Sequence, residues 1–172
     1  AKRSSYTGVR VYMYRRMKFE IFRDETQMKD IVRLIEKDLS EPYSIFTYRY
    51  FIHTWPDLCI TVKAEEDANK VMGVIVCKAE LYPKKDSKNS SHSDLAKSVG
   101  PAGDDNTSRM QGYIAMLAVD SAYRKRGVGT ALAKKAIETM RDVYKCKEIV
   151  LEAEYSNKAA LRFYDRLGFV RE

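Results

Sequence analysis

Residues 113–130 constrain the fold more than any other part of the sequence, because the segment YIAMLAVDSAYRKRGVGT changes its pattern twice. Residues 113–119 are almost wholly apolar and are followed by the turn-forming residues Asp120 and Ser121. A short apolar run bounded by turn residues predicts a central strand that is buried on both faces. Apolar residues then recur every three or four positions, at Val128, Leu132, Ala136, Met140 and Val143. This spacing predicts an amphipathic helix directly after the strand.

The junction between this strand and this helix has the residues of a phosphate-binding loop. Gly127 and Gly129 lack a Cβ atom, so the backbone can bring consecutive N–H groups close to a ligand. The first N–H groups of a helix have no partner within the helix and lie at the positive end of its dipole. Side-chain cations stand at the same place, at Arg124, Lys125 and Arg126. Turns also use paired glycines and basic runs often face solvent, but the order strand, basic loop, Gly-x-Gly and helix favours an anion site.

Apolar periodicity elsewhere predicts further strands at residues 18–23, 58–64, 71–81 and 147–154. Asp24 is placed to cap a helix that ends near Leu39, with an apolar face formed by Met28, Ile31, Val32 and Ile35. A second helix should follow the bend at Pro42 and run to about residue 55. Ser156 is the expected N-cap of a last helix that stops at Gly168, and residues 169–171 should begin another strand.

Two segments fall outside this pattern. Residues 1–16 form a basic, tyrosine-rich extension, which suits an edge strand as well as a flexible tail or partner-binding arm. Residues 82–110 are rich in Ser, Lys, Asp, Asn and Gly and poor in apolar residues, so they cannot bury enough surface to offset their ordering entropy. We therefore expect a disordered insertion between two strands of the sheet.

The composition narrows the class of protein. A chain of 172 residues with 45% hydrophobic residues suits one globular domain, and no apolar run approaches the length of a bilayer span. The three cysteines and two histidines show neither metal-ligand spacing nor a disulfide framework, which indicates a reducing compartment. The net charge of +7 fits an anionic partner, either a phosphorylated cofactor or an RNA surface, and charge alone does not separate them.

The pattern Arg124-x-x-Gly127-x-Gly129 after an apolar strand resembles the acetyl-CoA motif of the GCN5-related N-acetyltransferases (GNAT). Within that family, the chain is similar to the catalytic subunits of NatC N-terminal acetyltransferases. Four segments carry this similarity: LSEPYS at 39–44, YRYF at 48–51, GYIAMLAV at 112–119 and LEAE at 151–154. The family's NSAAL-type sequence appears here at residues 157–161, where Lys158 is a departure.

The resemblance implies an α/β fold class of the mixed α+β type, in which a central mixed sheet is flanked by about four helices. It implies acetyl-CoA as the co-substrate and no metal. The central strand and the strand at 147–154 should splay apart to admit the pantetheine, with the Leu117 N–H aimed at the thioester carbonyl oxygen. The residues expected to bind the cofactor are Leu117, Ala118, Val119, Arg124, Lys125, Arg126, Gly127, Val128, Gly129, Thr130 and Asn157.

Catalysis in such an enzyme requires a base, because an α-amine has a reference pKa of about 8 and is largely protonated at neutral pH. Glu152 is the expected base, since a mid-strand position between apolar neighbours would raise its pKa by desolvation. Glu154 is a weaker candidate on the same face, and a solvent-facing carboxylate is the plain alternative for both. The resemblance assigns Tyr164 to reprotonating or orienting the leaving thiolate, against an alternative role in helix packing.

The resemblance also implies the substrate and partners. The peptide site should comprise Leu39, Glu41, Pro42, Tyr43 and Tyr113. Substrates would be nascent protein N-termini that begin with Met followed by a bulky hydrophobic residue. The resemblance further implies two auxiliary NatC-type subunits, proximity to the ribosome and a cytoplasmic location. It implies no membrane partner and no specific nucleic-acid partner. In the family a further hairpin helps to close the peptide site, and the sequence ends before it. Another amine substrate, or a non-catalytic RNA-binding role, remains the alternative.

Overall fold

The computed structural model describes residues 17–37, 43–65, 67–83 and 108–171. The expectations for the basic extension, for residues 84–107 of the insertion, and for Leu39, Glu41 and Pro42 therefore lie outside the described residues. No helix in the described ranges is long and apolar enough to cross a membrane.

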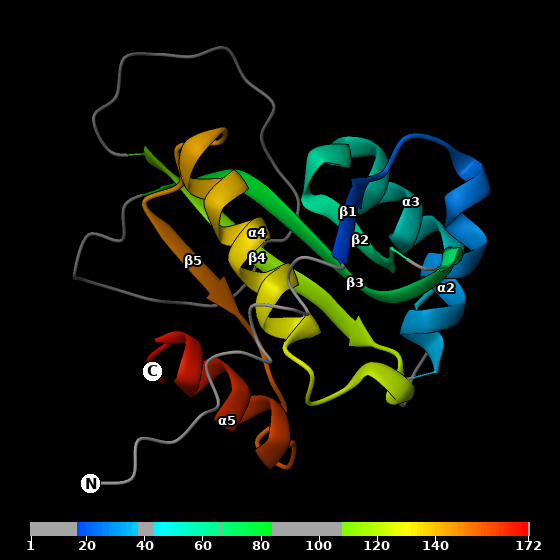
Figure 1. Cartoon of the computed structure of the whole chain (residues 1–172). Coiled ribbons are helices and arrows are strands. Elements are labelled where there is room, and N and C mark those ends of the chain that lie inside the picture. Colours follow the sequence, from blue (N-terminus) through cyan, green and yellow to red (C-terminus); the bar gives the residue numbers. More distant parts are fainter. Residues whose placement is uncertain (1–16, 38–42, 66, 84–107, 172) are drawn as a thin grey trace, which may run out of the picture.

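The described residues form a single mixed sheet of five strands in the order β1-β2-β3-β4-β5. The strands are β1 (Met17–Ile21), β2 (Cys59–Ala64), β3 (Asp67–Pro83), β4 (Ser108–Val119) and β5 (Glu148–Leu151). Neighbours are antiparallel from β1 to β4, whereas β4 and β5 are parallel (Figure 1). The mixed sheet confirms the fold class expected from the sequence, and β2 and β3 form an antiparallel hairpin in which Ala64 pairs with Asp67.

The helices also follow the predicted order. They are η1 (Glu25–Gln27), α2 (Met28–Glu36), α3 (Ile45–Thr54), η2 (Pro56–Leu58), η3 (Ser121–Tyr123), α4 (Val128–Asp142) and α5 (Lys158–Leu167). Asp24 and Gln27 form a capping box at the first turn, as the Asp24 prediction required. The helix that follows this cap, α2, ends at Glu36 rather than near Leu39.

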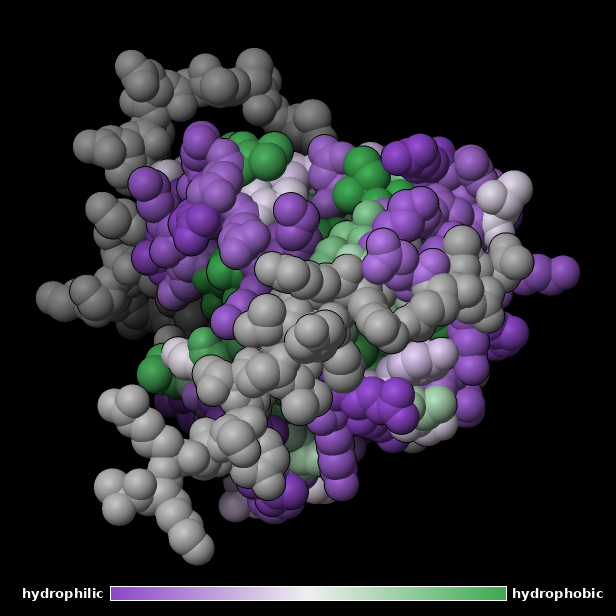
Figure 2. All heavy atoms as spheres, in the orientation of Figure 1, coloured by the Kyte–Doolittle hydropathy of each residue, from purple (hydrophilic) through white to green (hydrophobic). Residues whose placement is uncertain are grey.

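Two layers of helices cover the sheet, and each has its own apolar core. On one face, α4 places Leu132, Ala136 and Met140 fully out of solvent against β2, β3 and β4. On the other face, α2 and α3 bury residues that include Ile31, Ile35, Tyr48 and Ile52. Figure 2 shows mainly hydrophilic side chains over the outer face of the C-terminal part of α4, as an amphipathic helix requires.

One predicted core position was wrong, and one core residue was missed. Val143 is 61% exposed because α4 ends at Asp142 and Val143 is only its C-terminal cap. In α2, Val32 packs only at the edge of the core, where it is partly buried, and Leu34, which was not predicted, is 6% exposed within it. Both errors come from small offsets in helix phase and length.

The insertion is shorter than predicted, because both flanking strands extend into it. Tyr82 pairs with Arg109, and Pro83 pairs with Ser108. Composition could not reveal these pairs: a sheet ladder joins backbone groups, so polar residues such as Ser108 and Arg109 can continue it. The described part of the insertion, at residues 82–83 and 108–110, is therefore strand.

Candidate active site

A β-bulge interrupts β4 in the middle of the predicted central strand. Val76 pairs with Met116 and the next residue, Cys77, pairs with Ile114, which leaves Ala115 as an extra residue. Ile114 packs in the α4-side core, whereas Ala115 and Met116 both pack on the α2 and α3 side. The bulge thus turns the second half of β4 relative to the first.

The strands β4 and β5 separate at the same place. Their pairing covers only four positions and ends with Ile114 opposite Leu151, while β4 continues to Val119. The two ribbons diverge beyond this point (Figure 1). Among the described strands, none other than β3 pairs with β4 over residues 115–119, so backbone groups of Leu117 and Val119 border the gap. The splay expected from the sequence is therefore present.

The loop after β4 presents a helix end to this gap. The Asp120 side chain accepts a hydrogen bond from the Ala122 N–H at 2.9 Å and so starts the turn. Gly127 has φ of 86° in the left-handed region and is the N-cap of α4, with no side-chain capping hydrogen bond. Only glycine adopts this backbone conformation without strain. The first N–H groups of α4 therefore point outward, as an anion site requires.

The three cations of the loop differ in their contacts. The Arg124 Nε donates to the Val119 carbonyl at 3.0 Å and ties the loop to the end of β4. Arg126 lies over the Tyr123 ring at 5.7 Å, and Lys70 of β3 lies over the same ring at 5.2 Å. Lys125 is exposed. Positive charge is thus concentrated around the start of α4.

Gly129 lies in the first turn of α4 and faces the gap. A Cβ atom placed there would lie 3.5 Å from Phe163 and from Val119, which is ordinary contact. Packing therefore does not require glycine at this position. Val128 is buried and Thr130 is partly buried beside it, and Ala118 of β4 is 3% exposed.

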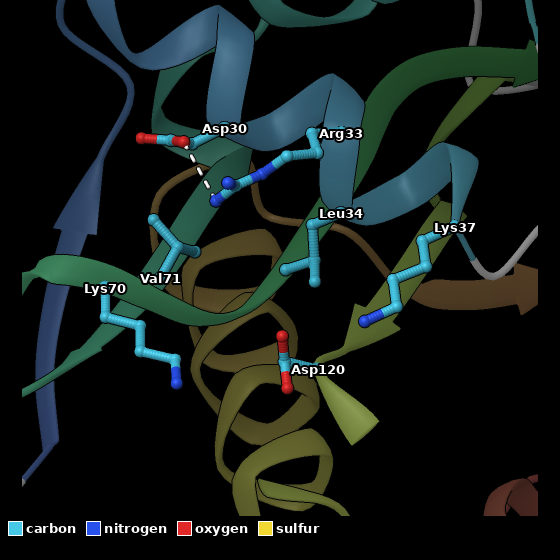
Figure 3. Close-up of a pocket in the computed structure, with 7 residues that line it drawn as sticks. All are labelled: Asp30, Arg33, Leu34, Lys37, Lys70, Val71 and Asp120. Carbon is cyan, nitrogen blue, oxygen red and sulfur yellow. Dashed lines mark ion pairs between the residues drawn. The ribbon is translucent and has the colours of Figure 1, made fainter. Parts of the chain in front are cut away.

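A hollow of about 400 Å³ lies on the opposite side of the loop, between α2 and the start of β3. Figure 3 shows its lining residues, in which Arg33 is paired with Asp30 at 3.1 Å. The remaining charges, on Lys37, Lys70 and Asp120, have both signs. A site of mixed charge is a poor match for phosphate groups, so this hollow is not the candidate cofactor site.

The N-terminus of α5 differs from the prediction by one residue. Asn157, not Ser156, is the N-cap: its side-chain oxygen accepts from the Ala160 N–H at 3.0 Å. The Ser156 hydroxyl instead donates to Glu154 at 3.1 Å. The cap occupies the Asn157 oxygen, so a ligand at this residue would be bound by the side-chain N–H groups.

Tyr164 lies on the inner side of α5, edge-on to Phe163 and Phe169 with ring centroids 5.0 and 5.7 Å away. Burial, with a smaller contribution from Cys77, raises the pKa of Tyr164 to about 12. Its hydroxyl makes no hydrogen bond to another described residue. Gly168 ends the helix in the left-handed region, as predicted. Residues 169–171 do not form the predicted strand, and the Arg171 side chain donates a hydrogen bond to Asp165 of α5.

Glu152 is not in the middle of a strand, which corrects the prediction. The strand β5 ends at Leu151, and both Glu152 and Glu154 are exposed beyond it. The desolvation expected from a mid-strand position is therefore not found. Glu152 nevertheless lies close enough to Tyr113 for its charge to act on the phenol, since Tyr113 pairs with Val150. Burial first, and the charge of Glu152 second, raise the pKa of Tyr113.

Tyr43 and Tyr113 are the described residues of the predicted peptide site. Tyr43 and Tyr82 contribute, after burial and Glu152, to the raised pKa of Tyr113. Tyr43 is 46% exposed, and its ring meets Tyr48 edge-on at 6.1 Å. Sequence reasoning missed Lys78 and Glu80, which lie beside Tyr113. Two opposite charges two positions apart in an otherwise apolar strand were the available signal.

Comparison with known proteins agrees with this geometry. The model of the acetyltransferase (GNAT) family matches residues 28–169. N-alpha-acetyltransferase 30 of Homo sapiens is 46% identical over 158 residues, which are 92% of this chain and 36% of that protein. N-alpha-acetyltransferase 30 of Saccharomyces cerevisiae is 38% identical over 151 residues, or 87% of this chain and 72% of that protein. The chain spans less than half the length of the human, mouse and frog relatives.

Solved structures give the same result. The crystal structure of the NatC complex bound to Gag peptide and CoA contains a chain with a TM-score of 0.71 and 35% identity, with coverage of 91% of this chain and 86% of the other. Naa50 of Arabidopsis thaliana shares the fold, with a TM-score of 0.64 and 19% identity. The match covers 91% of this chain and 84% of the Naa50 chain. The family match over most of the chain, together with the bulged and splayed strands, shows that this chain belongs to the acetyltransferase (GNAT) family.

Proposed function

We propose that this chain is the catalytic subunit of a NatC-type N-terminal acetyltransferase. It transfers an acetyl group from acetyl-CoA to the α-amine of proteins that begin with Met followed by a bulky hydrophobic residue. The observation that supports this most is the gap between β4 and β5, which opens beside a basic, uncapped helix N-terminus. The relatives named N-alpha-acetyltransferase 30 and the likeness to a NatC complex support the choice of substrate class.

The gap would hold acetyl-CoA, which supplies an activated thioester when it is bound. The N–H groups of Val128, Gly129 and Thr130, with the cations of the loop, would bind the pyrophosphate. Backbone groups of Leu117, Ala118 and Val119 would pair with the pantetheine as a neighbouring strand does. The Leu117 N–H would donate to the thioester carbonyl oxygen, where negative charge develops. Asn157 would add its side-chain N–H groups from α5.

Glu152 is the proposed base for the substrate amine. Its exposed position just beyond β5, near Tyr113, leaves the carboxylate open to an incoming amine or to a water between them. A base is needed because the α-amine, with a reference pKa of about 8, is mostly charged at neutral pH. Holding the amine against the thioester can itself lower the barrier by several kcal/mol.

Tyr164 is better suited to donate a hydrogen bond than to give up a proton. Its pKa of about 12 lies well above that of a thiol. Transfer of its proton to a thiolate of pKa about 8.5 would be uphill by about 5 kcal/mol. A hydrogen bond from the phenol would still stabilise the leaving thiolate. The proposal therefore keeps the orienting role of Tyr164 and drops the proton-donor role.

The peptide site would be formed by Tyr43 and Tyr113, with Leu39, Glu41 and Pro42 from the segment before α3. We further propose two auxiliary NatC-type subunits, a cytoplasmic location and work near the ribosome. The likeness to a chain of a NatC complex supports the presence of further subunits.

An acetylation assay with a peptide panel tests the proposal. The chain, with and without the auxiliary subunits, is given peptides beginning Met-Leu, Ser and an internal lysine with a blocked N-terminus. We expect acetylation of the Met-Leu α-amine, highest with the auxiliary subunits. Turnover of the blocked lysine peptide alone would indicate a different amine substrate. Salt-sensitive RNA binding without acetyl-CoA binding would indicate the non-catalytic alternative.

A further inference from the structure

An ion pair lies on the face of the sheet next to the proposed peptide site. Lys78 and Glu80 are two residues apart on β3, so both side chains point to the same face. The Lys78 Nζ lies 2.6 Å from the Glu80 Oε2, and the two side chains are only 20% and 31% exposed. The Lys78 ammonium also lies 5.6 Å from the centre of the Tyr113 ring.

The contacts of this pair leave hydrogen-bonding capacity on the lysine. The Tyr50 hydroxyl of α3 donates to the Glu80 Oε1 at 3.5 Å, so both oxygens of the carboxylate have a donor. An ammonium group has three donors, and Lys78 uses one of them on Glu80. Glu80 and Tyr50 thus hold an ammonium group that can still donate toward the site.

Stability alone is a weak explanation for the pair. A half-buried ion pair is often no more stabilising than two apolar side chains of the same size, because desolvation offsets the attraction. The neighbouring residues Cys77 and Ala79 are apolar and buried on the opposite face. A role in binding a ligand accounts for two charges at this place.

The sheet register sets the distance from the proposed chemistry. Lys78 lies opposite Tyr113, which in turn lies opposite Val150 of β5. Glu152 is two residues further along, or about 7 Å at the rise of an extended strand. The path also crosses two strand spacings of about 4.8 Å each, so the separation is roughly 12 Å. A peptide whose amine meets Glu152 and whose chain crosses Tyr113 would reach Lys78 after about three to four extended residues.

We propose that Lys78 binds the substrate by donating a hydrogen bond from Nζ to a main-chain carbonyl of the peptide, about three to four residues after the amine. Glu80 and Tyr50 are positioning residues for that ammonium. A carbonyl is the better match than a carboxylate, because Glu80 already neutralises the charge of Lys78. This inference rests on the proposed function and deepens it by adding an anchor that is independent of the peptide's side chains.

The test compares two ion pairs of similar burial in the same sheet. The double variant Lys78→Met with Glu80→Gln removes both charges, so neither is left unpaired. The matched control is Lys63→Met with Glu20→Gln, since Lys63 and Glu20 are 2.9 Å apart, have side chains 21% and 19% exposed, and lie on β2 and β1. Both are assayed with the auxiliary subunits on Met-Leu peptides that differ at the third and fourth residues.

We expect the peptide KM of the Lys78 and Glu80 variant to rise about 10- to 100-fold, equally for every peptide, as for a lost hydrogen bond to a charged group. Its kcat and its acetyl-CoA affinity should stay unchanged, and the control pair should leave KM unchanged. The single variant Lys78→Gln, which can still donate to Glu80 but is shorter, should raise KM likewise and serves if the double variant does not fold.

An unchanged peptide KM, or a rise confined to peptides with an acidic side chain, would overturn the inference and leave the proposed function standing. Wild-type protein that turns over no peptide N-terminus would refute the proposed function, and this inference with it.

Discussion

At the scale of single residues, the proposed base and the proposed hydrogen-bond donor lie in opposite environments. Glu152 is exposed just past the end of β5, where it can meet a substrate from solvent. Tyr164 is enclosed by two aromatic rings of its own helix and its C-terminal extension. In the proposed mechanism, the exposed carboxylate takes up a proton during turnover, whereas the enclosed phenol stays protonated.

Glu152→Gln should lower kcat by about 10²- to 10⁴-fold, because the amide keeps the shape of the side chain and lacks a basic oxygen. Acetyl-CoA affinity and melting temperature should not change, since the side chain is exposed. The defect should shrink as the pH rises through the amine's pKa of about 8, because the substrate then arrives deprotonated. A pH–rate profile measures this, with Glu154→Gln as the matched control. A preserved kcat with a raised KM would make Glu152 a binding residue instead.

The raised pKa of Tyr164 predicts a loss of stability in alkali. Its folded pKa is about 12, against about 10 for a free tyrosine. The protonated phenol stabilises the folded protein fully below pH 10, where Tyr164 is protonated in both the folded and the unfolded protein. This stabilisation is lost as the pH rises to 12. Unfolding of the wild type should become easier by about 2 to 3 kcal/mol in total relative to Tyr164→Phe, with about half of this change reached at pH 11. Urea unfolding of both proteins at pH 9 and pH 11 checks this, and parallel curves would contradict the assigned burial.

At the scale of elements, the bulge at Ala115 is the feature that the sequence could not reveal. The run of residues 113–119 is apolar on both faces, so two adjacent residues facing the same side leave no mark in the hydrophobic pattern. The loop before α4 and α4 itself were predictable, because their glycines and helical spacing carry specific signals. Asn157 and Ser156 are both good N-caps, so only the structure could choose between them.

Deletion of Ala115 should remove the splay without disturbing the core. Ala115 and Met116 face the same side, so the deletion leaves a regular alternation in which Ile114, Met116 and Leu117 keep their faces. We expect a folded protein with far-ultraviolet circular dichroism close to wild type and acetyl-CoA affinity at least 10-fold weaker. The control, Ala115→Gly, keeps the bulge. Wild-type affinity in the deletion would show that the bulge does not form the cofactor site.

At the scale of the whole molecule, the strand order and the two helix layers bring three features to one end of the sheet (Figure 1). These are the N-terminus of α4, the gap between β4 and β5, and α5. Strand and helix types were predictable from periodicity, but lengths were not. The strands β3 and β4 extend past the apolar pattern because their backbones pair regardless of side chains, and β5 stops early where its neighbour turns away.

Replacement of residues 84–107 by a short Gly/Ser linker should leave melting temperature and turnover nearly unchanged. The ends to be joined, Pro83 and Ser108, are paired neighbours, so a short turn can connect them. Loop length itself costs little closure entropy, by about 0.6 kcal/mol for each doubling. Differential scanning calorimetry and the Met-Leu assay check the result. A large fall in melting temperature would show that the segment contributes packing.

The assignment of the gap and the α4 N-terminus to acetyl-CoA is tested most directly by calorimetric titration of Gly129→Asp. An acidic residue in the first turn of a helix is compatible with its dipole, so the fold should persist. Gly129→Ala, whose methyl group would make ordinary 3.5 Å contacts with Phe163 and Val119, is the folding control. The account predicts no detectable acetyl-CoA binding by Gly129→Asp, because a carboxylate would stand where the pyrophosphate binds. Wild-type affinity in that variant would contradict it.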